Sequence, residues 1–452
     1  MIRTRFAPSP TGWLHIGGVR TALFSWLFAK SQKGEFVIRI DDTDTTRSSE
    51  EYCSSIISAL NLLGMNSDKD LVYQSKRFDL YIDKIEKLLE ENKAYYDKVE
   101  VNEKTKDTDL EIQFNNRLNK EGHVIRFRNQ KENKIKLKDL IHGEIIFEPK
   151  TFHDVVILRS NGVPTYNLTS VIDDISMDIS HVIRGDDHLS NTAIQINMFN
   201  AFNGTVPQFA HLPMIHGKDG KRLSKRHGAV DINTFIDDGY LKEALINYLA
   251  RTGWSHGDQE IFSMDELKEL FTINRVTKSA AIFDHDKLNW LNQYYIKNKK
   301  INEVAEMILP YLDLINIKVD DRSYLEDILR LGIERDFNLK NIAEGLQYYF
   351  TENIDYKNDI SYKPDSALSV KILEKILERF SSIEFSDKKL INENIKDVCQ
   401  ELTIKFKDIG PVLRFGLTGR LKAPSIDALC YVLGKDKSLK RLSNFKLFLE
   451  SN

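Results

Sequence analysis

The sequence predicts an α/β protein with a parallel sheet, an α+β insertion in that sheet and an all-α C-terminal region. Strand and helix patterns alternate near the N-terminus, in the order strand, loop, helix, strand, helix. Strand patterns then concentrate before residue 220, and helical patterns dominate after about residue 230. The first order is typical of doubly wound sheets that bind nucleotides, and the second indicates a separate helical domain.

The N-terminal elements follow from residue patterns read in order. Residues 2–7 predict a strand, and the sequence PSPTG after it predicts a turn. Apolar residues then recur at helical spacing. Residues 35–40 predict a second strand, and residues 48–63 a second helix capped by Ser48 with Glu51 as its partner.

The middle of the chain has a different character. Residues 79–96 predict a helix, and three stretches predict strands: VIRFRN, GEIIFEP and DVVILRSNGVPTYNL. HVIRGDDH then returns to a strand followed by a helix. We expect a sheet domain at 1–78 and 179–215, an insertion at 79–178, a loop and connecting region at 216–300, and helices at 301–452.

Composition excludes several classes of protein. The 452 residues are 29% charged and 41% hydrophobic with a formal net charge of −3, which predicts a soluble globular chain rather than a basic nucleic-acid coat. Any nucleic-acid contact must therefore use local basic surface. The three cysteines, Cys53, Cys399 and Cys430, are too far apart for a disulfide framework and fit a reducing cytosol. No signal peptide or membrane-spanning run is expected.

The stretch RFAPSPTGWLHIGG places His15, Gly17 and Gly18 between a strand and a helix. A helix N-terminus gathers backbone N–H groups and binds anions, and glycines let a ligand come close to the backbone. An ordinary strand–helix corner explains the pattern equally well. The dinucleotide fingerprint G-x-G-x-x-G is absent.

The segment GKDGKRLSKRHG, residues 217–228, gathers five cationic side chains and His227 between glycines. It does not match a Walker A loop, which needs Gly in place of Ile215 and Ser or Thr in place of Arg222. Flexible Lys and Arg side chains suit a clamp on a polyphosphate. The alternative is a solvated basic loop.

Charged residues also follow three predicted strands. RIDDTDTTRS, residues 39–48, places three carboxylates just after a strand. They suit recognition of an ammonium group or a ribose, and a solvated turn or a helix cap is the alternative. Arg5 and Arg184 lie in two other predicted strands. The carboxyl ends of parallel strands meet at one crevice, where two arginines would suit a ligand that bears a carboxylate. Ordinary ion pairs are the alternative for each.

Several motifs in a fixed order resemble those of glutamyl-tRNA synthetases, which are class I enzymes. They are RFAPSPTGWLHIGGVRTALFSWLFA, RIDDTDTTRS, LRSNGVPTYNLTSVIDD, HVIRGDDHLSN, RLSKR, AIFDHDKLNWLNQYYI and GPVLRFGLTG, and they cover nearly the whole chain. The resemblance implies a class I Rossmann-type sheet, an acceptor-stem-binding insertion at 79–178, a KMSKS-type loop and stem-contact region at 216–300, and an anticodon-binding domain at 301–452.

The resemblance also implies the chemistry and the partners. Glutamate and ATP, with Mg²⁺, form glutamyl-adenylate, and the glutamyl group then passes to the 3′ end of a tRNA. No protein nucleophile is required, because the substrate carboxylate attacks the α-phosphate and the protein positions the reactants. A cytoplasmic monomer without membrane contact is expected.

The family's functional positions carry over to this sequence by number, as follows from the matching motifs. Catalysis falls to His15, Arg222 and Lys225; glutamate binding to Arg5, Ala7, Ser9, Asp41, Tyr166 and Arg184; and ATP binding to Gly17, Gly18, Asp187, Ile215, Leu223, Ser224 and Lys225. The arginines are expected to bind the substrate side-chain carboxylate, and Asp41 with Tyr166 its ammonium group. Ile215 and Leu223 are expected to offer backbone atoms to adenine.

The sequence departs from the family pattern at a few positions. Asp41 and Asp186 replace the usual Glu, and Arg222 replaces a Lys. Some bacterial members hold zinc through cysteines after AYY, but AYYDKVEVNEK has none, so we expect no zinc there.

These departures leave alternatives open beside charging of tRNA-Glu. The chain could be a divergent second copy that charges tRNA-Gln, a relative that glutamylates queuosine, an inactive RNA-binding paralogue or a generic nucleotidylyltransferase. Some two hundred helical residues after the basic loop argue against the shortened queuosine relative. Intact His15, Lys225, Arg5 and Arg184 argue against the inactive paralogue.

Overall fold

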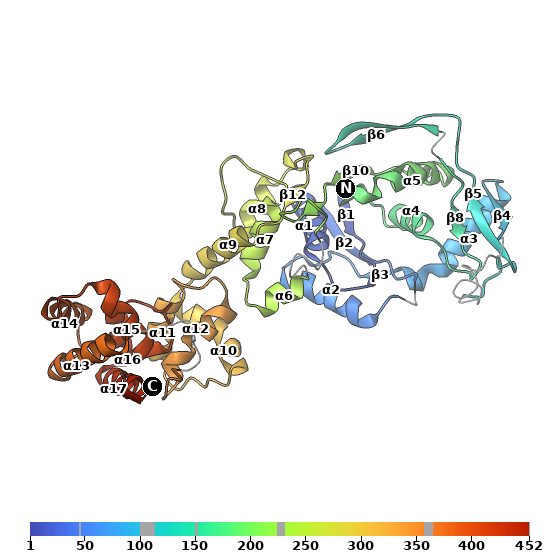
Figure 1. Cartoon of the computed structure of the whole chain (residues 1–452). Coiled ribbons are helices and arrows are strands. Elements are labelled where there is room, and N and C mark those ends of the chain that lie inside the picture. Colours follow the sequence, from blue (N-terminus) through green and yellow to red (C-terminus); the bar gives the residue numbers. More distant parts are fainter. Residues whose placement is uncertain (45–46, 100–113, 150–151, 224–230, 357–364, 452) are drawn as a thin grey trace. The chain divides into compact units, whose positions relative to one another are not determined.

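The computed structural model describes residues 1–44, 47–99, 114–149, 152–223, 231–356 and 365–451 (Figure 1). The chain forms two compact units. One comprises Met1–Asp237 with Lys242–Leu288, and the other Asp238–Leu241 with Asn289–Asn452. The first unit is α/β, and the described part of the second is helical, which confirms the predicted fold class. The finer domain boundaries expected from the sequence stay predictions.

A five-stranded parallel sheet organises the first unit. Its strands lie in the order β10 (Gln208–Leu212), β9 (His181–Gly185), β1 (Arg3–Phe6), β2 (Glu35–Ile40) and β3 (Val72–Tyr73). Every neighbouring pair is parallel. From β1 the chain adds β2 and β3 on one side, and it later adds β9 and β10 on the other side of β1. The switch point of this doubly wound sheet therefore lies between β1 and β9, where such sheets bind ligands.

Two helices follow the first strands. Helix α1 (Ile16–Ser31) packs on β1, β2 and β9, and helix α2 (Glu50–Leu62) follows β2. The cap of α2 is Ser49, whose hydroxyl accepts a hydrogen bond from the Glu51 N–H at 3.2 Å, so the prediction of Ser48 is wrong. The Ser48 N–H is bound to the Asp44 carbonyl within a turn, which leaves Ser49 as the extended residue before the helix.

The segment between β3 and β9 forms its own small sheets. Strands β4, β5 and β8 form one antiparallel sheet, and β6 and β7 form a hairpin. The elements are η1 (Gln74–Arg77), α3 (Phe78–Glu90), β4 (Ala94–Lys98), β5 (His123–Phe127), β6 (Ile135–Asp139), β7 (Gly143–Phe147), β8 (Val156–Leu158) and α4 (Tyr166–Ser176).

Two expectations for this segment are wrong. The helix predicted over 79–96 ends at Glu90, because Asn92 has a φ of 54° and turns the chain into β4. The strand predicted over DVVILRSNGVPTYNL covers only Val156–Leu158, and Tyr166 already begins α4. Neither a single residue with positive φ nor a strand of three residues produces a periodic pattern of apolar residues, so the sequence did not reveal either boundary.

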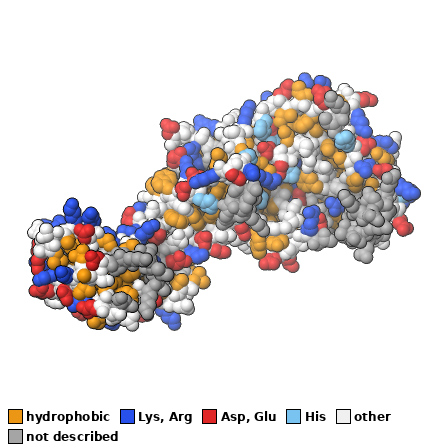
Figure 2. All heavy atoms as spheres, viewed as in Figure 1, with side chains coloured by type: hydrophobic (Ala, Val, Ile, Leu, Met, Phe, Trp, Pro, Cys, Tyr) orange, Lys and Arg blue, Asp and Glu red, His pale blue; other side chains and the backbone are white. Residues whose placement is uncertain are grey.

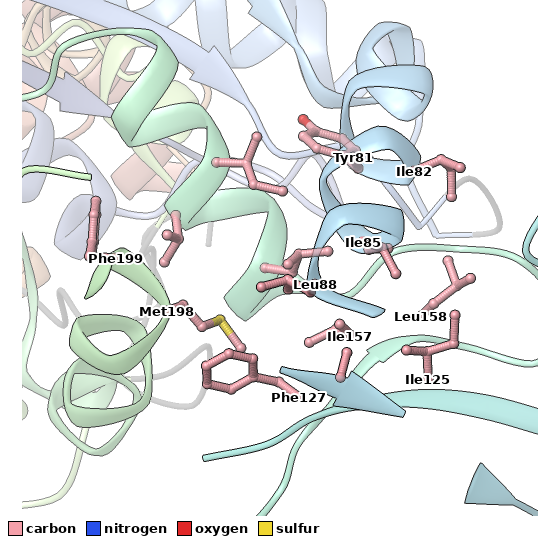
Figure 3. Packing of buried hydrophobic residues seen from close by; sticks show 14 of the residues in the cluster. Tyr81, Ile82, Ile85, Leu88, Ile125, Phe127, Ile157, Leu158, Met198 and Phe199 are labelled. Carbon is pink, nitrogen blue, oxygen red and sulfur yellow. The ribbon is translucent and has the colours of Figure 1, made fainter. Parts of the chain in front are cut away.

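Figure 3 shows the hydrophobic cluster that joins this segment to the rest of the unit. Side chains of α3 pack against β5, β8 and α5 (Leu189–Ala201), which precedes β10. The labelled members are Tyr81, Ile82, Ile85, Leu88, Ile125, Phe127, Ile157, Leu158, Met198 and Phe199. The cluster also includes Val182 of β9 and Phe209 of β10. The inserted segment and the parallel sheet thus share one core.

The remaining elements of the first unit are η4, which directly follows β9, and those from β11 to β12. Strand β11 pairs in parallel with β12, and the chain between them forms most of the helices in this part. These elements are η4 (Asp186–His188), β11 (Ile215–His216), α6 (Ile232–Asp237), α7 (Lys242–Arg251), α8 (Met264–Leu270), η6 (Ile273–Arg275) and β12 (Ala281–Ile282).

The second unit is built from amphipathic helices. They are the end of α9 (His285–Lys297), then α10 (Ile301–Leu314), α11 (Arg322–Gly332), α12 (Leu339–Phe350), α13 (Ser366–Ser382), α14 (Lys388–Glu401), α15 (Phe406–Thr418), α16 (Ile426–Leu433) and α17 (Lys435–Ser451). Among described residues, no helix is both long and apolar enough to cross a membrane.

Arg441 of α17 joins two helix ends in this unit. Its guanidinium, in a residue only 1% exposed, donates to the carbonyls of Tyr348 and Thr351 at 2.6 Å and of Leu417 at 2.7 Å. These carbonyls lie at the ends of α12 and α15, where helices leave acceptors unsatisfied. On the face shown in Figure 2, Lys and Arg side chains are interspersed with Asp and Glu.

Candidate active site

Two arginines meet at the switch point of the sheet. Arg5 is the penultimate residue of β1, and Arg184 is the penultimate residue of β9. Both are buried. Burial lowers the pKa of Arg184 and the nearby charge of Arg5 lowers it further, whereas Tyr166 and the more distant Asp174 oppose the shift. The sequence expectation that these two side chains share one crevice is therefore consistent with their places in the sheet.

Arg39 of β2 is the centre of a buried ion network beside Arg5. Its residue is 0% exposed, and its guanidinium binds Asp41 at 2.7 Å and Asp174 at 2.6 Å. Asp173 lies 3.6 Å away, and Arg5 also binds Asp174, at 3.2 Å. Burial raises the pKa of Asp41 to about 6, although Arg39 opposes the shift. Asp41 is thus already engaged by an arginine of its own strand.

The outer side of this network is closed by neutral donors and a second arginine. The Asp173 carboxylate accepts hydrogen bonds from Gln74 at 2.8 Å and from the Tyr81 hydroxyl at 2.9 Å. Arg77 lies 3.2 Å from its other oxygen. Burial raises the pKa of Asp173, and Arg39 and Arg77 oppose that shift. Every carboxylate around Arg39 therefore has at least one positive partner.

Arg184 has a different set of partners, all of them neutral. Its guanidinium donates to the Thr192 hydroxyl at 2.7 Å, the Tyr166 hydroxyl at 3.3 Å, the His188 carbonyl at 3.4 Å and His211 Nε2 at 3.4 Å. Its residue is 6% exposed. Within the described ranges no carboxylate lies within 4 Å of this guanidinium. The buried positive charge is therefore not compensated by an ion pair with the described residues.

Tyr166 and His188 complete the wall beside Arg184. The Tyr166 hydroxyl lies 3.1 Å from His188 Nδ1. Burial lowers the pKa of His188 to about 4, and Arg184 contributes to the shift, so the imidazole is neutral near pH 7. Among the hydrogen bonds of the described residues, none joins Tyr166 to Asp41. His188 is the last residue of the motif HVIRGDDH. Its contact with Tyr166 could not be read from the sequence, because it depends on where α4 begins.

His15 lies at the N-terminus of α1, where it caps the helix. Its Nδ1 accepts a hydrogen bond from the Gly18 N–H at 3.2 Å. A Cβ added at Gly17 would lie 2.9 Å from Cε1 of the His15 ring. An alanine at 17 would therefore require the ring of His15 to move, because the ring itself occupies that space. The sequence expectation had left this space to a ligand.

Arg222 and Asp187 lie on the same side of the site as His15. Arg222 Nη2 is 3.6 Å from the Asp187 carboxylate, and both side chains are exposed. Partial enclosure lowers the pKa of His15, the charge of Arg222 lowers it further, and Asp187 raises it. Gly185 leaves room for Asp187, since a Cβ there would lie 2.5 Å from its Oδ1. Three residues expected at the ATP side are thus brought together.

The backbone around the basic loop is tightly paired. The Leu223 N–H donates to the Ile215 carbonyl at 2.9 Å, so this N–H is already bound, while the carbonyl oxygen keeps a second lone pair for a ligand. After residues 224–230, Asp231 forms a bridge with His15, and the Ile232 N–H donates to the Leu14 carbonyl at 3.0 Å. The described residues on both sides of 224–230 therefore lie beside His15. Ser224 and Lys225 lie outside the described residues.

The segment after β1 is fixed by backbone hydrogen bonds. The Pro8 carbonyl accepts from the Asp41 N–H at 2.9 Å, and the Pro10 carbonyl accepts from the Ser49 N–H at 3.1 Å. These bonds hold Ala7 and Ser9 near the carboxyl ends of β1 and β2, and Ser9 is exposed. Asp42, the next carboxylate after β2, instead binds Ser75 through its backbone and hydroxyl at 2.8 and 2.6 Å.

The described part of the chain contains no group of three or more His, Cys, Asp or Glu side chains placed to hold a metal ion. The residues that sequence reasoning missed are Arg39, Asp173, Asp174, Thr192 and His211. They lie in quoted or neighbouring motifs, but their roles depend on contacts between distant strands and helices.

Comparisons with known proteins agree with this fold. Residues 1–290 match the family model described as tRNA synthetases class I (E and Q), catalytic domain, and residues 303–446 match an anticodon binding domain. The chain is 43% identical over 461 residues to "Glutamate--tRNA ligase 1" of Coxiella burnetii, covering 99% of this chain and 98% of the relative. It is 38% identical over 460 residues to "Glutamate--tRNA ligase" of Francisella tularensis subsp. novicida, covering 98% of each.

Solved structures give the same result. A glutamate tRNA ligase from Elizabethkingia meningosepticum, in complex with its amino acid, superposes with a TM-score of 0.80 at 31% identity, covering 99% of each chain. The glutamate-tRNA synthetase from Elizabethkingia anophelis superposes with a TM-score of 0.82 at 30% identity, again over 99% of each chain. This chain therefore belongs to the glutamyl-tRNA synthetases of class I.

Proposed function

We propose that this chain ligates L-glutamate to the 3′ end of tRNA-Glu in an ATP-dependent reaction through glutamyl-adenylate. The names of its full-length relatives and the family model support the reaction class. The match of residues 303–446 to an anticodon binding domain supports tRNA as the partner. The observation that carries the choice of amino acid is the uncompensated charge of Arg184 at the switch point of the sheet.

Arg184, with Arg5 beside it, would bind the side-chain carboxylate of glutamate. A carboxylate brings the negative charge that the surroundings of Arg184 lack, and glutamine would leave the buried guanidinium unpaired. Ala7, Ser9 and Tyr166 line the same end of the strands and would contact the rest of the amino acid. Asp41 would bind the ammonium group through whichever carboxylate lone pairs Arg39 leaves open.

His15, Gly17, Gly18, Asp187 and the basic loop would form the ATP side. The substrate carboxylate attacks the α-phosphate and pyrophosphate leaves, so the protein positions both reactants and stabilises charge. Arg222 and Lys225 would hold the leaving pyrophosphate, and Ile215, Leu223 and Ser224 would contact the nucleotide.

Mg²⁺ coordinated by the phosphates of ATP would neutralise part of their charge. This ion usually keeps phosphate and water ligands with only one or two protein carboxylates. The absence of a three-residue metal cluster among the described side chains is compatible with that mode. We also propose that the chain acts as a cytoplasmic monomer.

Charging of purified tRNA-Glu and tRNA-Gln, measured side by side with glutamate, tests the proposal. Efficient charging of tRNA-Glu is the expected result. A strong preference for tRNA-Gln would instead indicate the divergent second copy, and no charging of either would indicate the inactive paralogue.

Lys225→Ala tests the ATP side separately. Because the amino group acts on the pyrophosphate, the rate of adenylate formation should fall, while the affinity for tRNA changes little. A rate equal to that of the parent protein would remove Lys225 from this role.

A further inference from the structure

His211 at the end of β10 lies fully buried against Arg184 and is bonded through both ring nitrogens. Its residue is 0% exposed. Nδ1 lies 2.7 Å from Asp139 Oδ2, and Nε2 lies 2.9 Å from the Thr192 hydroxyl and 3.4 Å from Arg184 Nε. The ring therefore connects a carboxylate on one side to the two groups that hold Arg184 on the other.

Asp139 fixes which nitrogen of His211 carries the proton. Its Oδ2 accepts a hydrogen bond from the backbone N–H of His211 and also faces the ring atom Nδ1. Its Oδ1 accepts from the backbone N–H groups of Ile141 and His142 at 2.8 and 2.9 Å. Although burial opposes it, these hydrogen bonds hold the pKa of Asp139 below its ordinary value. An ionised carboxylate with this set of donors requires Nδ1–H, which leaves the Nε2 lone pair facing Arg184 and Thr192.

The Thr192 hydroxyl is oriented by the same arrangement. It accepts from Arg184 Nη2 at 2.7 Å, so its proton is available to His211 Nε2 at 2.9 Å, the nearer acceptor, and to the His188 carbonyl at 3.3 Å. Burial lowers the pKa of His211 and Arg184 lowers it further, which outweighs the opposite effect of Asp139, so the imidazole stays neutral. Arg184 is thus held by oriented lone pairs, and the one carboxylate in this chain of contacts is kept on the far side of a neutral ring.

We propose that Asp139 and His211 are positioning residues for Arg184, which orient its guanidinium through neutral acceptors and leave its charge for the carboxylate of the amino acid. Asp139 is the last residue of β6, in the segment inserted between β3 and β9, and the Leu140 N–H bonds the Phe209 carbonyl of β10 at 2.8 Å. The inserted segment therefore contributes a specificity-determining residue to the amino-acid pocket. This inference rests on the proposed glutamate specificity.

Asp139→Asn is the decisive variant, because it keeps the shape and removes the charge. With its nitrogen in the place of Oδ2, the amide donates to Nδ1 and no longer accepts from the His211 backbone N–H. The imidazole proton then lies on Nε2, where it presents a donor to Arg184. We expect the KM for glutamate to rise about 10- to 100-fold, since small displacements of a positioning group have effects of this size, with the KM for ATP changed less than twofold. A second variant, His211→Phe, should show the same selective rise.

The matched control is His181→Phe on β9. His181 is also a buried histidine in the parallel sheet, but it contacts Ser180 and the Phe28 ring rather than Arg184. The variant His181→Phe should leave the KM for glutamate unchanged. Equal changes in the KM for glutamate and for ATP in Asp139→Asn, or an effect matched by the control, would overturn the inference.

Nitrogen-15 NMR of the His211 ring gives a readout that does not depend on activity. The parent protein should show a protonated Nδ1 and a free Nε2, and Asp139→Asn the reverse. A parent protein with protonated Nε2 would contradict the proposed orientation of Arg184. If the parent protein does not use glutamate at all, the proposed function fails, whereas normal glutamate use with an unchanged KM in Asp139→Asn removes only this inference.

Discussion

Two buried arginines, each the penultimate residue of a strand in the parallel sheet, differ in how their charge is balanced. Arg39 on β2 has Asp41 and Asp174 within ion-pair distance and Asp173 at 3.6 Å. Arg184 on β9 has hydroxyl, carbonyl and imidazole acceptors and, within the described residues, no carboxylate. Carboxylates of the protein itself balance the charge of Arg39, whereas Arg184 retains a charge that a bound anion would balance.

The comparison separates a structural charge from one available to a ligand. An ion network such as that of Arg39 is costly to break, because each removed partner leaves a buried opposite charge. A buried guanidinium without a carboxylate costs stability in the free protein, and binding of an anion recovers it. Arg441 shows that lack of a carboxylate is not sufficient, since helix-end carbonyls accept its hydrogen bonds in a site with no opening at a sheet switch point.

The largest effect is expected for Arg39→Met. Its removal leaves buried carboxylates without their main positive partner, so the free energy of unfolding should fall by about 3–5 kcal/mol. Asp41 already has a pKa of about 6 and loses the guanidinium that lowers it, so the carboxylates will take up protons at low pH. Their penalty disappears as they are protonated, so the deficit should be larger at pH 8 than at pH 5 in urea titrations. An equal deficit at both pH values would contradict the network.

Arg184→Met should change function more than stability. Loss of the carboxylate partner should raise the KM for glutamate by about 100-fold, equivalent to about 3 kcal/mol, with much less effect on the KM for ATP. Steady-state pyrophosphate exchange with each substrate varied in turn measures the split. Equal losses for both substrates would mean that Arg184 supports the whole site rather than the amino acid.

His188, whose carbonyl accepts from Arg184, makes the stability of the Arg184 site depend on pH. Its pKa is about 4 in the folded state and near 6.5 when unfolded, so the unfolded chain binds a proton that the folded site refuses. Its contribution to stability is therefore present above pH 6.5 and is lost as the pH falls toward 4. His188→Asn, which keeps an acceptor for Tyr166, should lose less stability between pH 7 and pH 5. A slope equal to that of the parent protein would place the proton uptake elsewhere.

The smallest effect is expected at the other end of the site, for Gly17→Ala. The new Cβ displaces the His15 ring, and loss of its cap on α1 should cost about 1 kcal/mol. Thermal unfolding measures the cost, and the KM for ATP should rise while that for glutamate stays the same. Gly410→Ala within α15, where an added Cβ comes no closer than 3.4 Å to a neighbouring side chain, is the matched helical control.

The sequence predicted the parallel sheet and the meeting of Arg5 with Arg184, because strand patterns and the rule for strand ends are local signals. His15, Asp187 and Arg222 lie near one another, and their assignment to the ATP side, made from the family motifs, stays a prediction. It did not predict that Asp41 is bound by Arg39, since that pairing depends on the depth of burial of β2. The contacts of His211 with Asp139, 72 residues apart, follow only from the packing of the β6–β7 hairpin on β10.

Urea unfolding of the parent protein and of Arg184→Met, each with and without saturating glutamate, tests the central claim most directly. Without glutamate the variant should be at least as stable as the parent protein, because an uncompensated buried charge has been removed. Glutamate should then stabilise the parent protein and not the variant. The claim would be contradicted if Arg184→Met lost several kcal/mol without ligand, as predicted for Arg39→Met, or if glutamate stabilised the variant as much as the parent protein.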